Sequence, residues 1–198
     1  MKKIEGYIPL EKLDIVCNSI EAAHGLPNEC YLGGDYSKFE RKYLFEDKWV
    51  VIGVASSIKN PGDAVPFNLL GIPLIILRDK DQSIRVFHNV CSHRGYKILQ
   101  KPCRIKNALR CPYHSWAYDL NGKLVSTPHL GGMDKNEAEG FNKSDSNLHE
   151  VRSYIWLDMI FVNISNNQIP FDEYIKPLED RWSQFWPKED QSLIKHAD

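Results

Sequence analysis

The chain lacks a long apolar run, an excess of charge of either sign, and an abundance of cysteine. Its 198 residues include 25 Lys or Arg and 26 Asp or Glu, which gives a net charge of -1. Nucleic-acid-binding proteins usually carry a basic excess, so this balance argues against a nucleic-acid partner. No run of 18 apolar residues occurs, and we therefore expect no membrane-spanning helix and no membrane partner.

We expect no secretory leader, because Glu5 and Lys12 interrupt the apolar stretch that a signal peptide needs. We therefore expect a cytoplasmic protein, a setting in which structural disulfides are rare. The five cysteines are odd in number, and two of them lie beside histidines. Metal binding is thus a better hypothesis than a disulfide framework for this set, which comprises Cys17, Cys30, Cys91, Cys103 and Cys111.

Short apolar runs separated by turn residues fill the middle of the chain. They are rich in Val and Ile and span residues 49–56, 64–70, 72–79, 83–90, 148–156 and 159–165. Residues 116–125 hold Asn121-Gly122 between two extended pieces, which predicts a hairpin with a primed turn. Several short strands with turn signals between them are typical of an antiparallel β domain, so the predicted fold class is mainly β.

Helical patterns flank these strands. An apolar stripe predicts a helix over residues 10–24, and a capping-box pattern from Ser37 to Glu40 predicts another through Phe45. We divide the chain into an N-terminal helical segment (1–46), a strand-rich domain (47–165) and the beginning of a further domain (166–198). The last part has a helical pattern over residues 171–186 but no core of its own, so we expect it to be poorly packed.

Two short motifs carry the functional signal. Cys91-Ser-His93 and Cys111-Pro-Tyr-His114 each offer one thiolate and one imidazole, and 17 residues separate them. Thiolates suit one iron of a two-iron cluster, and imidazoles suit the other, more reducible iron. The alternative is a structural zinc site. Zinc sites of the Cys2His2 type usually pair Cys with Cys and His with His, which these motifs do not.

The stretches CSHRG and CPYHSW, preceded by VFHNV and followed by YDLNGKL, resemble the α subunits of Rieske non-haem iron oxygenases, the ring-hydroxylating family. The resemblance covers roughly residues 36–165. It implies a Rieske-type antiparallel β-sandwich with two loops that bind a [2Fe–2S] cluster at one tip. It also implies that Cys91 and Cys111 hold one iron and that His93 and His114 hold the other.

The same resemblance implies an electron-transfer function. The cluster would receive electrons from a reductase or ferredoxin and pass them to a mononuclear non-haem Fe(II), commonly in a neighbouring α subunit of a trimer. That iron hydroxylates an organic substrate, either an aromatic ring or a quaternary ammonium compound. Its two His ligands and one carboxylate lie C-terminal to the Rieske domain, and no matching pattern occurs here. We therefore expect this chain to hold no catalytic residue and to be inactive alone.

A stand-alone Rieske ferredoxin is the alternative function, although such carriers need no helical flanks. Respiratory-type Rieske proteins place a disulfide and a serine near the cluster, where this chain has Tyr96, Tyr113 and Trp116. We therefore expect a reduction potential of roughly -150 mV, at the low end of the Rieske range. Tyr118 is expected to reach a cysteine sulfur or to pack beneath the loops. Most family members have Gly where Ser115 stands, a departure that concerns backbone geometry.

Several other residues have ordinary interpretations. His88 reads as structural, and Cys17, Cys30 and Cys103 read as small buried hydrophobes. Residues 94–110 contain six basic residues and no acid. This segment is either a docking face for an acidic electron donor or a solvated loop balanced by the acidic stretch 134–150, and we slightly favour the solvated loop.

Overall fold

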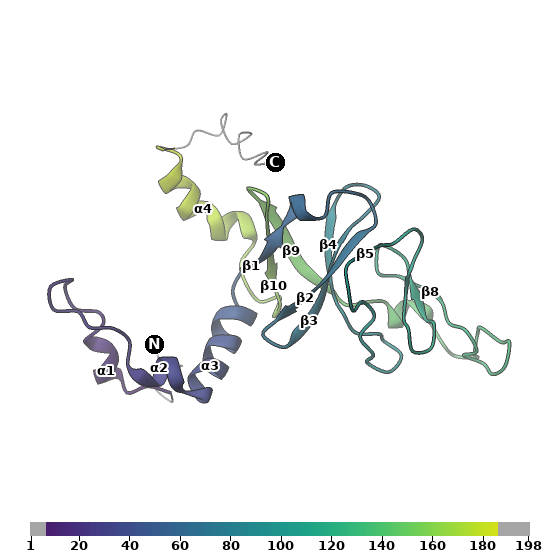
Figure 1. Cartoon of the computed structure of the whole chain (residues 1–198), viewed down its shortest axis with the longest axis horizontal. Helices are drawn as coiled ribbons and strands as arrows, with labels where there is room; N and C mark the ends of the chain where they lie inside the picture. The colour runs from purple at the N-terminus through teal and green to yellow at the C-terminus, as the bar shows by residue number, and fades with distance from the viewer. Residues whose placement is uncertain (1–6, 186–198) are drawn as a thin grey trace. The chain divides into compact units, whose positions relative to one another are not determined.

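The computed structural model describes residues 7–185 and divides the chain into two compact units, with the boundary between Lys48 and Trp49 (Figure 1). Among the described residues, no helix has both the length and the apolar character needed to cross a membrane. The described part of the first unit is helical, and every strand in residues 7–185 belongs to the second unit.

The N-terminal unit consists of short helices, namely α1 (Leu10–Asp14), α2 (Asn28–Leu32), α3 (Gly34–Glu40) and the π-helix η1 (Arg41–Glu46). Phe39 is its aromatic centre. The centroid of the Phe39 ring lies 5.0 Å from that of Tyr7 and 4.9 Å from that of Tyr43. The helix predicted from Ser37 exists, but it begins at Gly34. Ser37 lies inside it and donates to the Gly34 carbonyl, so the capping-box interpretation is wrong.

The helix predicted over residues 10–24 is also wrong beyond Asp14, after which the chain makes turns. An amphipathic helix gains most of its stability from burying its apolar face. Here Ile20 on that stripe is 87% exposed, whereas Leu10, Leu13 and Val16 are half-buried, so the C-terminal part of the stripe does not gain this stabilisation. Cys17, which we expected to be buried, is exposed, as is Cys103, whereas Cys30 is half-buried.

The second unit is built from antiparallel strands, which confirms the mainly β prediction. Seven strands form one sheet in the order β1-β10-β9-β4-β3-β2-β5, and three form another in the order β6-β7-β8. The large sheet comprises β1 (Val50–Val54), β2 (Asp63–Leu69), β3 (Ile72–Arg78), β4 (Ile84–His88), β5 (Cys103–Arg104), β9 (Glu150–Trp156) and β10 (Met159–Asn163). The small sheet comprises β6 (Leu109–Arg110), β7 (Ala117–Tyr118) and β8 (Leu124–Ser126).

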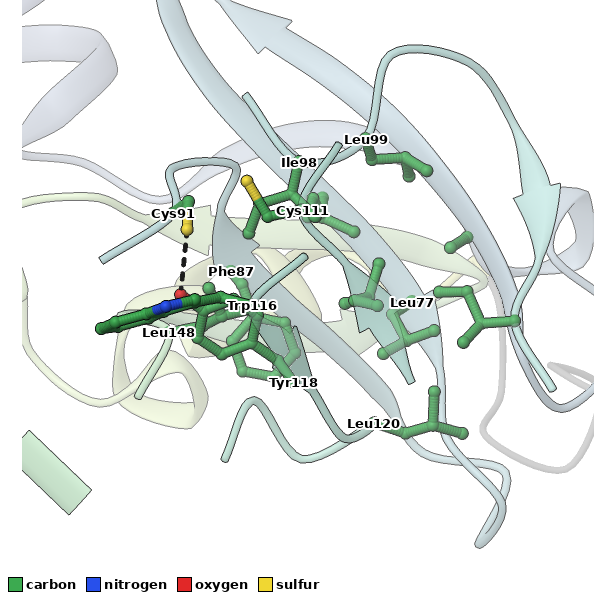
Figure 2. Close-up of a cluster of buried hydrophobic side chains, with 14 of the residues drawn as sticks. Leu77, Phe87, Cys91, Ile98, Leu99, Cys111, Trp116, Tyr118, Leu120 and Leu148 are labelled. Atoms are coloured by element: carbon green, nitrogen blue, oxygen red, sulfur yellow. Dashed lines mark hydrogen bonds between the residues drawn. The ribbon is translucent and has the colours of Figure 1, made fainter. Parts of the chain in front are cut away.

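One hydrophobic core joins the two sheets. Alternate residues of β3 and β4, including Ile75, Leu77 and Phe87, contribute buried side chains, and they meet Tyr118 of β7 and Trp116, which immediately precedes that strand. Cys91 and Cys111 belong to the same core and lie at one end of it in Figure 2. The ligand motifs are therefore attached directly to the best-packed part of the chain.

The hairpin predicted over residues 116–125 is present, but its turn is not of the primed type. Only Gly122 adopts a left-handed conformation, with φ of 76°, whereas a primed type I turn needs two such residues. The Asp119 carboxylate accepts from the backbone N–H groups of Asn121 and Lys123, which stabilises the alternative turn. A Cβ on Gly122 would lie 2.6 Å from Phe87, so this turn packs closely on the core.

Helix α4 (Phe171–Trp182) corrects another expectation. Phe171 and Ile175 are buried in a second core with Trp49 and Phe161, so one face of this helix is packed rather than loose. The Trp49 indole also donates to the Ile169 carbonyl at 3.0 Å. Phe185, which follows the helix, is 79% exposed. Trp186, which we grouped with the same segment, lies outside the described residues.

Candidate metal centre

The two ligand motifs adopt the same turn. In the first loop, the Cys91 N–H donates to the carbonyl of Tyr96 at 2.8 Å, and the Gly95 N–H donates back to Cys91 at 2.9 Å. In the second loop, the Cys111 N–H donates to the Trp116 carbonyl at 2.8 Å, and the Ser115 N–H donates to the Cys111 carbonyl at 3.0 Å. Residues 91–96 and 111–116 are therefore matching turns, and each starts at a cysteine.

Each turn requires a left-handed residue at its fifth position. Gly95 has φ of 69° and Ser115 has φ of 59°. A residue with a Cβ is strained in this conformation, whereas glycine adopts it freely. The Arg110 guanidinium donates to the Ser115 carbonyl at 3.0 Å and so supports the strained position. The serine noted in the sequence thus occupies a site where the backbone favours glycine.

The structure brings all four predicted ligands together. The cysteines are 2% and 1% exposed, and the Cys91 thiol lies near enough to Cys111 to help raise the pKa of the Cys111 thiol. The half-buried rings of His93 and His114 are neighbours, with centroids 4.7 Å apart. The donors therefore form a cysteine pair and a histidine pair, although each loop contributes one member to each pair.

Unpartnered nitrogen atoms show that these residues suit a metal. The Nδ1 atoms of His93 and His114 are buried and have no hydrogen-bond partner. A buried polar atom without a partner costs roughly 1–3 kcal/mol, a penalty that coordination of a metal would remove. Burial lowers the pKa of His93, and the charges of His114 and Arg94 lower it further. The ring is therefore kept in the neutral form that binds metals.

The arrangement fits two irons better than one zinc. A structural zinc ion needs four donors around one point, whereas each iron of a mixed-ligand two-iron cluster takes two protein donors. Burial also raises the pKa of the Cys111 thiol, so its deprotonation depends on metal binding.

Tyr118 makes the contact that we expected of it. Its hydroxyl lies 3.2 Å from Cys91 Sγ, drawn as a dashed line in Figure 2, and it accepts from the Ser92 N–H at 3.1 Å. Burial raises the pKa of Tyr118 far above its usual range, so the hydroxyl stays protonated and can donate to sulfur. Tyr118 therefore both packs in the core and contacts a predicted ligand.

Trp116 supports a histidine instead of a sulfur. Its ring is buried and stacks on His93, with centroids 4.6 Å apart and planes 9° apart. Phe141 covers Trp116 in turn, in an edge-on contact at 5.7 Å. From the sequence we had considered Phe141 only as part of the acidic stretch 134–150, and we missed this role. The single aromatic residue in that polar stretch was the available signal.

The histidine pair borders a hollow at the surface. A hollow of about 520 Å³ is lined by both imidazoles, by Tyr113 and Trp116, and by the neighbouring residue Leu130. His88, which we interpreted as structural, is not among the grouped donors. Its backbone N–H donates to the His149 carbonyl at 2.9 Å, and burial lowers its pKa.

The basic residues between the two loops are exposed at the surface. Arg104 forms an ion pair with Asp63 at 2.7 Å. In the described part of the chain, no ion pair joins residues 94–110 to the acidic stretch 134–150, whose Glu137 instead pairs with Lys143 at 3.5 Å. The structure therefore gives no support to the balance that we expected between these two segments.

Comparisons with known proteins agree with this geometry. The profile of the Rieske [2Fe-2S] domain matches residues 48–144. The chain is 26% identical over 176 residues to the carnitine monooxygenase oxygenase subunit of Acinetobacter pittii, covering 88% of this chain and 46% of that protein. It is 32% identical over 158 residues to the benzene 1,2-dioxygenase subunit alpha of Pseudomonas putida, covering 78% and 34%.

A solved structure shows the same fold. The apo form of a quaternary ammonium Rieske monooxygenase superposes with a TM-score of 0.74 and 25% sequence identity, covering 87% of this chain and 48% of the other. The chain thus spans less than half the length of the relatives that it matches.

Proposed function

This chain carries a Rieske [2Fe-2S] domain of the kind found in oxygenase α subunits, and on that basis we propose that Cys91, His93, Cys111 and His114 are the ligands of its cluster. A Rieske cluster carries one electron at a time. The observation that carries the assignment is the pair of buried, unpartnered Nδ1 atoms beside a buried cysteine pair. The cysteines would hold one iron and the histidines the other.

The surrounding side chains have separable roles in this proposal. Burial of Cys91 and Cys111 excludes water from the thiolate side. Tyr118 donates to the Cys91 sulfur, which stabilises negative charge there. Trp116 fixes the plane of the His93 ring by stacking. No serine hydroxyl stands at the Trp116 position, so we keep the expectation of a potential near the low end of the Rieske range, roughly -150 mV.

We further propose that an acidic reductase or ferredoxin docks beside the histidine pair. Tyr113 is 55% exposed, and its ring lies against His114 with centroids 3.7 Å apart. Tyr96 forms an exposed pair with it at 5.4 Å. Arg94 and Lys97 are exposed in the same loop segment and would attract an acidic partner. This surface joins the solvent to a ligand through one aromatic ring.

The electron acceptor in this proposal is a mononuclear non-haem Fe(II) of an oxygenase, in a neighbouring α subunit of a trimer. The carnitine and benzene enzymes named above suggest two substrate classes, quaternary ammonium compounds and aromatic rings. The matching relatives are oxygenase subunits, which argues against a stand-alone ferredoxin. We also keep the cytoplasm as the proposed location.

Reconstitution tests the proposal directly. The chain would be purified, supplied with iron and sulfide, and reduced, with visible and EPR spectra recorded at each stage. We expect a reducible two-iron cluster and no hydroxylated product from aromatic or quaternary ammonium substrates. Stoichiometric zinc without iron would contradict the ligand assignment. Substrate-dependent product formation would show that the chain contains a second iron site.

A further inference from the structure

The segments that flank the two ligand turns are connected in different ways. Beyond the second turn, β6 and β7 pair through their backbones, with Leu109 opposite Tyr118 and Arg110 opposite Ala117. Beyond the first turn, a side chain makes the connection. Asn89 Nδ2 donates to the Leu99 carbonyl at 2.6 Å, and Asn89 Oδ1 accepts from the Leu99 N–H at 2.8 Å.

This pair of bonds imitates one rung of an antiparallel ladder, in which two residues exchange N–H···O bonds. Asn89 is fully buried and Leu99 is 7% exposed, so water cannot replace either bond without local opening. The Asn89 backbone N–H also donates to the Pro73 carbonyl of β3 at 2.8 Å. One residue thus ties both ends of segment 89–99 to the large sheet.

We propose that Asn89 is the positioning residue of the first ligand loop. It stands two residues before Cys91, and its bonds to Leu99 connect the two ends of the segment that contains Cys91 and His93. Its side chain therefore does for this segment what the β6–β7 ladder does for the segment that contains Cys111 and His114. Loss of this connection should free the first ligand pair while the second stays in place. The inference rests on the proposed function, because the loop is worth positioning only if it holds the cluster.

The test compares two buried asparagines in the cluster-loaded protein. Asn89→Asp keeps the shape and the acceptor for Leu99 N–H but removes the donor to the Leu99 carbonyl. Asn163→Asp is the matched control, since Asn163 is also fully buried, on β10, and accepts from the Gln168 N–H at 3.3 Å. Cluster loss to a chelator is followed by visible absorbance, and global unfolding is followed by circular dichroism.

We expect Asn89→Asp to release the cluster on the order of tenfold faster than Asn163→Asp at equal global stability. Equal release rates, or release that follows global unfolding alone, would overturn the proposal. Hydrogen–deuterium exchange of the unsubstituted protein gives a second reading if Asn89→Asp does not fold. The Leu99 amide should then be as protected as the ladder amide of Tyr118, and fast exchange at Leu99 would also overturn it. A protein that takes up no cluster at all would instead contradict the proposed function.

Discussion

The two ligand loops have the same backbone conformation but differ in the contacts that support it. The second loop lies inside a local backbone ladder and is braced by Arg110, its own neighbour in sequence. The first loop depends on side chains, some from distant segments, including Tyr118 and a bond from Ser92 Oγ to the Asn147 carbonyl at 3.0 Å. A common turn therefore sets the ligand geometry, while the two loops should differ in their sensitivity to substitution.

The largest effect should come from loss of a cysteine ligand, and it should be the same for both loops. Cys91→Ala and Cys111→Ala should each abolish cluster incorporation, because each iron needs both of its protein donors. Iron and sulfide content and the visible spectrum measure the loss. Cys103→Ala is the control, since Cys103 is exposed and outside both loops. Full iron content in either ligand variant would break the assignment.

Tyr118→Phe should remove support that the first loop has and the second lacks. It removes the hydroxyl that contacts Cys91 Sγ and accepts from Ser92. If this bond stabilises the reduced cluster by about 1.4 kcal/mol more than the oxidised cluster, its loss should lower the one-electron potential by about 60 mV. Protein-film voltammetry measures the shift, and Tyr154→Phe is the control, since its hydroxyl donates to Asp172 instead. An unchanged potential in Tyr118→Phe would show that this bond does not tune the cluster.

Exchanging the fifth residues of the turns should produce opposite and smaller changes. Gly95→Ser places a side chain at φ of 69°, where no heavy atom lies within 4 Å, so strain alone should cost about 1 kcal/mol of unfolding free energy. Ser115→Gly should relieve similar strain and gain less, because glycine also loses more entropy on folding. Denaturant unfolding measures both variants. A stabilising Gly95→Ser would contradict the equivalence of the turns.

The smallest effect concerns the strand that follows the first loop. The bond from Arg104 lowers the pKa of Asp63 to about 2, and this ion pair joins β5 to β2. Because the folded pKa lies below the unfolded one, its stabilisation is present above about pH 4 and disappears as the pH falls towards 2. Asp63→Asn should remove that part of the acid dependence of unfolding. An unchanged acid profile would show that this ion pair contributes nothing measurable to stability.

The sequence was sufficient for features with a strong local signal. Val- and Ile-rich runs predicted the strands, and the Cys and His spacing predicted which four side chains meet. It was insufficient where tertiary packing decides. The stripe predicted over residues 10–24 leaves Ile20 exposed and is helical only to Asp14, and the turn at Asn121-Gly122 is stabilised by the Asp119 carboxylate. The repeated pattern of Cys, three residues, Gly or Ser, then an aromatic residue could have revealed the matching turns at Cys91 and Cys111.

The most direct test of the central claim is pulsed EPR of the reduced protein with ¹⁵N-labelled histidine. A cluster held by His93 and His114 should show couplings to two histidine nitrogens. His88→Ala should keep both couplings, because His88 lies outside the donor group. A reduced cluster without histidine couplings, or a protein with no reducible iron–sulfur signal after reconstitution, would contradict the account.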